Sequence, residues 1–157
     1  MLELLREFHH DKLAVRQRHV AAARHIGDYD FNNAYQYIIA REDMQVRWLY
    51  DAIADMGGQA DEVPEPEVKL SGKGAAAQRA ILGDDRDRAR AFVDKWRPRI
   101  DALPNARHRS MLRVILGETL EQQRMFEQAL AGRTDVLGRR ADGAGTTGEV
   151  LPTRWVE

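Results

Sequence analysis

The chain has 157 residues, of which 43% are apolar and 31% charged, so its size and composition suit one ordinary domain with a hydrophobic core. Its formal net charge of -1 argues against a general nucleic-acid binder, which needs a positive field. The absence of cysteine excludes disulfides, thiol catalysis and thiolate metal sites. The N-terminus has no signal-peptide pattern, and no stretch approaches the roughly 20 apolar residues that span a bilayer, so we predict a cytoplasmic protein without a membrane partner.

Apolar residues at helical spacing predict two helices in the first part of the chain. The first covers about residues 2–26 and the second about residues 31–56. Gly27 is typical of a helix end, and Asp28 or Asp30 can cap the helix that follows. Because the connection is so short, the two helices must form an antiparallel hairpin.

Two more helices are predicted after a long connection. Residues 57–74 contain several glycines and prolines and show no helical pattern. The third helix covers about residues 75–103, where Gly83 marks a kink or a later start and Pro98 should bend the helix. The fourth covers about residues 106–131, and the short turn before it predicts a second antiparallel hairpin.

The connection lengths predict an all-α, ferritin-like four-helix bundle, in which two hairpins are joined by one long crossover. We assign the bundle to residues 1–132 and a non-helical tail to residues 133–157. The tail ends in apolar residues, which a wholly disordered segment would rarely carry. We therefore expect the tail to dock on the bundle or on a neighbouring subunit, and we expect a homodimer. The apolar residues are Val150, Leu151, Pro152, Trp155 and Val156.

Polar side chains interrupt the apolar stripe of every predicted helix. Glu42 and Gln45 lie in the stripe of the second helix, Asp85 in that of the third, and Glu118 in that of the fourth. His19 lies on the apolar face of the first helix, although the rotation of this helix is ambiguous. A lone buried carboxylate costs several kcal/mol unless it is paired, protonated or bound to a metal. Polar groups from four helices are thus expected to face one another.

The segment Ile39-Ala40-Arg41-Glu42-x-x-Gln45, followed by a glycine-rich helix end, resembles the ferritin-like (rubrerythrin-type) di-iron carboxylate family. That family uses one Glu from each of two helices and a Glu-x-x-His from each of the other two. The resemblance implies a bundle fold and a site for iron or manganese, which suit carboxylate and imidazole ligands.

Carried over residue by residue, the resemblance makes Glu42 and Glu118 bridging carboxylates. The positions of the expected histidines hold Gln45 and Glu121. The first helix lacks the expected Glu, and Asp85 is a shorter stand-in on the third. The resemblance therefore implies a bundle with a lapsed or altered metal site, whose candidate ligands are Glu42, Glu118, Asp85, His19, Gln45 and Glu121.

The first functional hypothesis is a structural or interaction module with a buried polar network. Hydrogen bonds or ion pairs would then satisfy Glu42 and Glu118, and Glu42→Leu would be neutral or stabilising, because buried ion pairs often break even. The candidate partners are Arg18, His19, Gln45, Gln122 and Arg124.

The second hypothesis is a metal-dependent oxidoreductase or metal-handling protein with unusual ligands. It requires three or more oxygen or nitrogen ligands to converge on one point, at about 2.0–2.4 Å. A third possibility is an apolar pocket for a small molecule, with adaptable methionine walls. Its wall residues would be Met44, Met56, Met111 and Met125.

Overall fold

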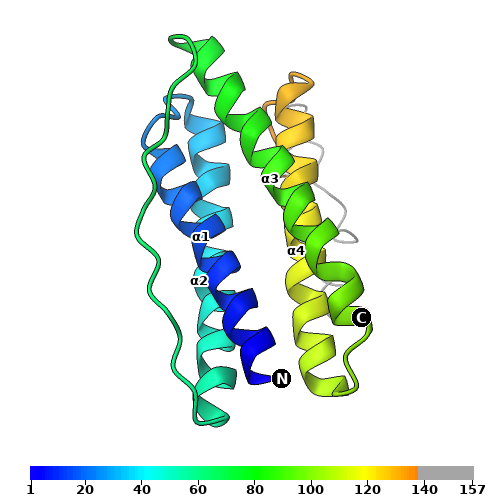
Figure 1. Cartoon of the computed structure of the whole chain (residues 1–157). Helices are drawn as coiled ribbons and strands as arrows, with labels where there is room; N and C mark the ends of the chain where they lie inside the picture. The colour runs from blue at the N-terminus through cyan, green and yellow to red at the C-terminus, as the bar shows by residue number, and fades with distance from the viewer. Residues whose placement is uncertain (138–157) are drawn as a thin grey trace.

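The protein is an all-α bundle of four helices, as predicted, and the part of the chain that the structure describes contains no strand (Figure 1). The computed structural model describes residues 1–137. The helices are α1 (Leu2–Ala23), α2 (Tyr29–Asp55), α3 (Ala75–Asp101) and α4 (Ala106–Leu130). The first helix ends before the predicted residue 26, because the chain turns at Arg24.

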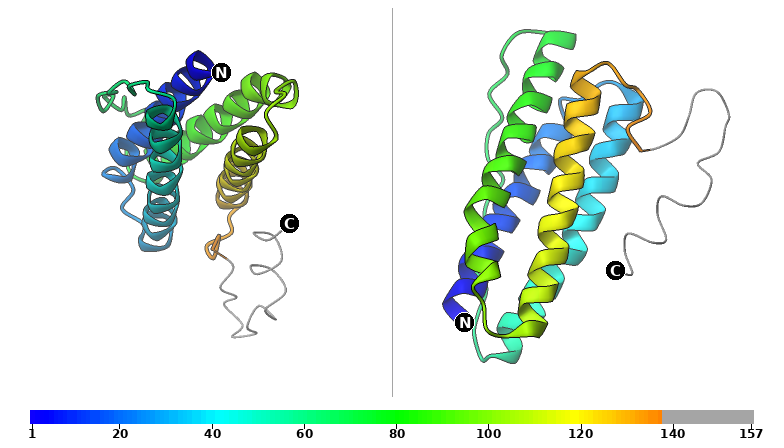
Figure 2. Two further views of the ribbon diagram at one scale, coloured as in Figure 1. Left: turned by 90° about the horizontal axis from the view of Figure 1, so that it is seen from below. Right: turned by 90° about the vertical axis from the view of Figure 1, so that its right-hand side faces the viewer.

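Two antiparallel hairpins form the bundle. α1 packs on α2 and α3 packs on α4, while α1 faces α3 and α2 faces α4 across the bundle. Residues 56–74 run along the whole length of the bundle, from the end of α2 to the start of α3 (Figures 1 and 2). This crossover makes α2 and α3 point the same way, so that each helix is antiparallel to both helices that it contacts. It is the single long crossover that the connection lengths predict.

Side chains at the helix ends and along the crossover fix these boundaries. Asp28, one of the two predicted caps, accepts a hydrogen bond from the Phe31 backbone N–H at 3.1 Å at the start of α2. The crossover is held to α1 by a 2.8 Å bond from Gln17 Nε2 to the Val63 carbonyl. α3 runs without a break through Pro98.

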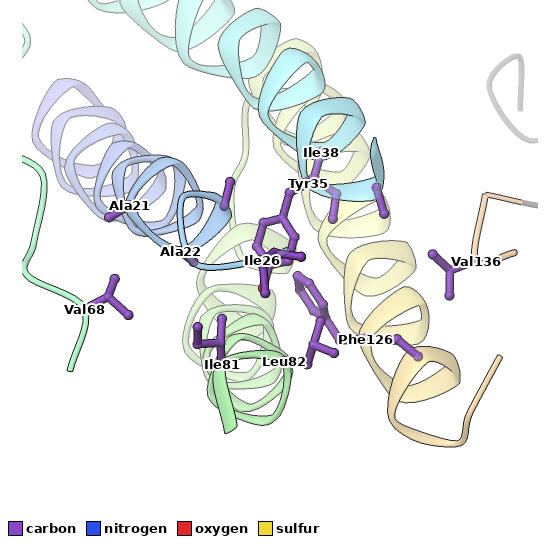
Figure 3. Close-up of a cluster of buried hydrophobic side chains, with 13 residues drawn as sticks. Ala21, Ala22, Ile26, Tyr35, Ile38, Val68, Ile81, Leu82, Phe126 and Val136 are labelled. Atoms are coloured by element: carbon purple, nitrogen blue, oxygen red, sulfur yellow. The ribbon is translucent and has the colours of Figure 1, made fainter. Parts of the chain in front are cut away.

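Apolar side chains gather in two clusters, one toward each end of the bundle. The upper cluster (Figure 3) joins the end of α1 and the start of α2 to the start of α3 and the end of α4. The lower cluster is centred on Phe8, Phe92 and Trp96, and Phe8 meets the two other rings edge-on at 5.2 and 4.8 Å. These clusters supply most of the apolar burial that stabilises the fold.

A polar layer separates the two clusters. In each helix, its polar members fall between the residues that the helix gives to the upper cluster and those that it gives to the lower one. All of them are at most 4% exposed. The members of the polar layer are Lys12, His19, Glu42, Gln45, Asp85, Glu118, Thr119 and Gln122.

The chain after α4 carries no helix over residues 133–137. The rest of the predicted tail, and its predicted docking, lie outside the described residues. Within residues 1–137, none of the helices combines the length and the apolar character needed to cross a membrane.

Candidate functional site

Glu42 lies at the centre of the polar layer and is bound by two side chains of α1. Lys12 Nζ donates to Glu42 Oε1 at 2.8 Å, and His19 Nδ1 lies 2.8 Å from Glu42 Oε2. The side chains of Lys12 and Glu42 are 0% exposed and that of His19 is 1% exposed. Because the carboxylate can only accept, the proton of this second bond lies on His19 Nδ1.

Lys12, His19 and Glu42 form a buried triad. Opposing effects of burial and of neighbouring charges set the pKa values of Glu42 and His19. Burial by itself raises the pKa of Glu42, but the neighbouring His19 and Lys12 outweigh burial and hold it at about 2. Burial by itself lowers the pKa of His19, but the Glu42 carboxylate outweighs burial and raises it above the ordinary 6.5. Glu42 is therefore a carboxylate at neutral pH, held between two groups that favour its charge.

Asp85 of α3 is bound by α1 and α2. Arg18 Nε donates to Asp85 Oδ1 at 3.0 Å, and the Tyr35 hydroxyl donates to Asp85 Oδ2 at 2.5 Å. Burial raises the pKa of Tyr35, and the Asp85 carboxylate raises it further, to well above the ordinary 10. Tyr35 therefore stays protonated and serves as a donor.

Glu118 of α4 is bound by α2. Arg41 Nη2 donates to Glu118 Oε1 at 2.5 Å, and Gln45 Nε2 donates to Glu118 Oε2. The Arg41 side chain is 34% exposed, so water screens part of this ion pair. Together with Asp85, Glu118 ties the second hairpin to the first, whereas Glu42 is satisfied within the first hairpin.

The structure buries five of the six candidate metal ligands, but it distributes them among three separate hydrogen-bonded groups. Glu121 is not in the polar layer: it lies half-buried on α4 and pairs with Arg124 at 2.7 Å. Of the five candidate partners of Glu42 and Glu118, His19 and Gln45 bind them, whereas Arg124 pairs with Glu121. Arg18 binds Asp85 instead of the glutamates for which it was proposed.

Sequence reasoning missed Lys12 and Arg41, the cations nearest to the two buried glutamates. A signal for Lys12 exists, because it lies four residues after Phe8 and three before Val15, within the apolar stripe of α1. The sequence gives no such signal for Arg41, because this residue lies beside the apolar stripe of α2. Its long side chain extends inward to bind Glu118.

The carboxylates and imidazoles of residues 1–137 do not gather into a metal centre. Within the described residues, no group of three His, Asp or Glu side chains lies together in a way that could hold a metal ion. Both oxygens of Glu42 already accept hydrogen bonds, one of them from an ammonium group. Gln45 Oε1 and Gln122 Oε1 are the buried acceptors of the polar layer that have no protein partner.

The four methionines considered as walls of an apolar pocket differ in burial. Met44 and Met56 are exposed, whereas Met111 and Met125 are partly buried. Met125 lines a cavity of about 10 Å³ in the upper cluster, which has room for no more than one water molecule.

No protein-family model, curated protein or solved structure matches this chain.

The triad should make stability depend on pH in two directions. Folding lowers the pKa of Glu42 from the ordinary 4.5 to about 2, so ionised Glu42 stabilises the fold at pH values above 4.5. This contribution is lost as the pH falls toward about 2. Folding raises the pKa of His19 above the ordinary 6.5, so protonated His19 stabilises the fold at pH values below 6.5. This contribution is lost as the pH rises through the pKa of His19 in the folded protein. We expect the melting temperature to be highest between these limits. In His19→Gln the decline above pH 6.5 should be weaker, and an unchanged decline would contradict this assignment.

Because Lys12 is paired with Glu42, we now expect Glu42→Leu to destabilise the fold, and not to be neutral or stabilising as the sequence suggested. Alone, this substitution leaves the Lys12 ammonium buried without its carboxylate, so we expect it to destabilise the fold by about 3–5 kcal/mol. Lys12→Met should cost a similar amount, and the double variant should be more stable than either single one. Urea unfolding measures these differences, with Asp43→Asn at an exposed ion pair as the control. Additive losses in the double variant would show that Lys12 and Glu42 are not coupled.

Proposed function

We propose that this chain is a ferritin-like bundle in which a buried ion-pair network takes the place of a metal centre, and that it acts as a structural or interaction module. The single observation that carries the proposal is the contact between Lys12 Nζ and Glu42 Oε1 at 2.8 Å. The ammonium supplies Glu42 with the positive charge that a metal ion would otherwise supply.

Electrostatics supports this interpretation. A divalent cation near Glu42 would be repelled by the Lys12 ammonium, which lies 2.8 Å from one oxygen of the same carboxylate. Both carboxylate oxygens of Glu42 also accept hydrogen bonds, from Lys12 Nζ and from His19 Nδ1. A metal ion at Glu42 would therefore compete with Lys12 and His19 for the carboxylate oxygens.

The burial of the triad also argues against catalysis at this position. A general acid or base must come within hydrogen-bond reach of its substrate, directly or through one water. Lys12 and Glu42 are sealed between the two apolar clusters, at 0% exposure. Their role in this proposal is to hold the helices in register, while exposed surfaces of the bundle carry the interactions. A homodimer and a cytoplasmic location, both predicted from the sequence, are compatible with this role.

A second candidate is a metal-binding protein with unusual ligands. One observation favours it: Gln45 Oε1 and Gln122 Oε1 are buried acceptors without a protein partner, and Gln45 is bonded to Glu118. Amide and carboxylate oxygens are ligands that manganese accepts. In this alternative, the ion would lie near Glu118 instead of Glu42.

Elemental analysis separates the two candidates. Protein purified without an affinity tag or chelator would be loaded anaerobically with ferrous or manganous ion and then desalted. We expect far less than one metal per chain. One or two metals per chain that are lost in Glu42→Ala would overturn the proposal. Metal that is retained in Glu42→Ala but lost in Gln122→Leu would establish the second candidate.

A further inference from the structure

An apolar face lies along the outer side of α2 and α4. On α2 it consists of Tyr37, Met44 and Trp48, and on α4 of Met111 and Val114. Met44 is 50% exposed, Val114 46% and Tyr37 38%, while Trp48 and Met111 are partly buried. We call these five residues the α2/α4 face.

The helical spacing of these five residues, together with one ion pair between the helices, places them on one surface. Tyr37, Met44 and Trp48 follow one another at intervals of seven and four residues, which places them on the same side of α2. Arg41 lies one turn from Tyr37 and one turn from Met44, and its ion pair with Glu118 joins the two helices. Glu118 in turn lies one turn from Val114. The apolar residues of both helices therefore flank a single bridge.

The chain turns back over these two helices after α4. Gly132 adopts a positive φ of 93°, and the Arg133 N–H bonds the Gln128 carbonyl at 3.0 Å, which closes the helix end. Val136 is then buried in the upper cluster with Phe126 of α4 and Ile38 of α2 (Figure 3). The last described residues thus lie at the upper end of the side that carries the α2/α4 face.

We propose that the α2/α4 face is a docking surface for residues 150–156 of the same chain. This segment, which lies outside the described residues, has the sequence Val-Leu-Pro-Thr-Arg-Trp-Val, with five apolar residues to cover an apolar face. The proposal rests on where the described chain ends and is independent of the proposed function.

The length of the chain allows this docking. The stretch from Leu137 to Val150 can span up to about 40 Å, at roughly 3.3 Å per residue. The distance along α4 from Phe126, beside Val136, to Met111 is only about 22 Å, at 1.5 Å per residue. A segment tethered so closely has an effective concentration in the millimolar range, which favours it over a second copy at ordinary protein concentrations.

The absence of cysteine allows a direct test in the full chain. One variant carries Met44→Cys with Val156→Cys, and a matched control carries Ala91→Cys, an exposed position on α3, with Val156→Cys. Each is treated with a short bis-maleimide, and mass spectrometry distinguishes an internally bridged monomer from a linked dimer. We expect the Met44 variant to form the bridged monomer at least about tenfold faster than the control.

Trp155→Ala, added to the Met44 variant, should bring the rate down toward that of the control. A variant with Val114→Cys and Val156→Cys repeats the measurement from α4, in case Met44→Cys disturbs folding. Equal rates in the face variants and the control would overturn the proposal. A linked dimer as the main product of the face variants would also overturn it, because the occupant would then belong to a second copy.

Discussion

Three carboxylates lie in the interior of this bundle, and each needs a partner, because an unpaired buried charge costs about 3–5 kcal/mol, a large part of the stability of a domain. The two hairpins meet this requirement jointly. Lys12 and His19 of α1 bind Glu42 of α2. Arg18 of α1 binds Asp85 of the second hairpin. α2 gives Arg41 and Gln45 to Glu118 of α4. The relative positions of all four helices follow from these pairings.

The polar layer also gives the bundle a fixed register. The apolar clusters above and below it are held by non-directional burial of aliphatic and aromatic side chains. The bonds from Arg18 to Asp85 and from Arg41 to Glu118 do not tolerate a shift of one turn, because each carboxylate would lose its cation. A bundle fixed in this way can present a defined outer surface, such as the α2/α4 face.

Much of this fold follows from the sequence, because helices and their ends depend on local signals. Gly27 and Asp28 indicate the first hairpin, the short turn before residue 106 indicates the second, and the glycine- and proline-rich crossover indicates how the two are joined. The burial of Glu42, Asp85 and Glu118 follows from their places in apolar stripes. The partners of these carboxylates could not be predicted in this way, because pairing depends on how the helices are rotated and on how far long side chains reach. Lys12 lies within the apolar stripe of α1, but lysine is almost never fully buried, so its residue type argues against the position that the structure gives it.

The Lys12 ammonium lies in the interior, where it neutralises Glu42. The most direct measurement is nuclear magnetic resonance of protein labelled with ¹⁵N in its lysine side chains, since the chain contains only four lysines. One ammonium signal should show slow hydrogen exchange with water, should be absent in Lys12→Met and should change in Glu42→Gln. Rapid exchange of every lysine ammonium would contradict the account, because Lys12 would then be accessible to water and Glu42 would need another partner.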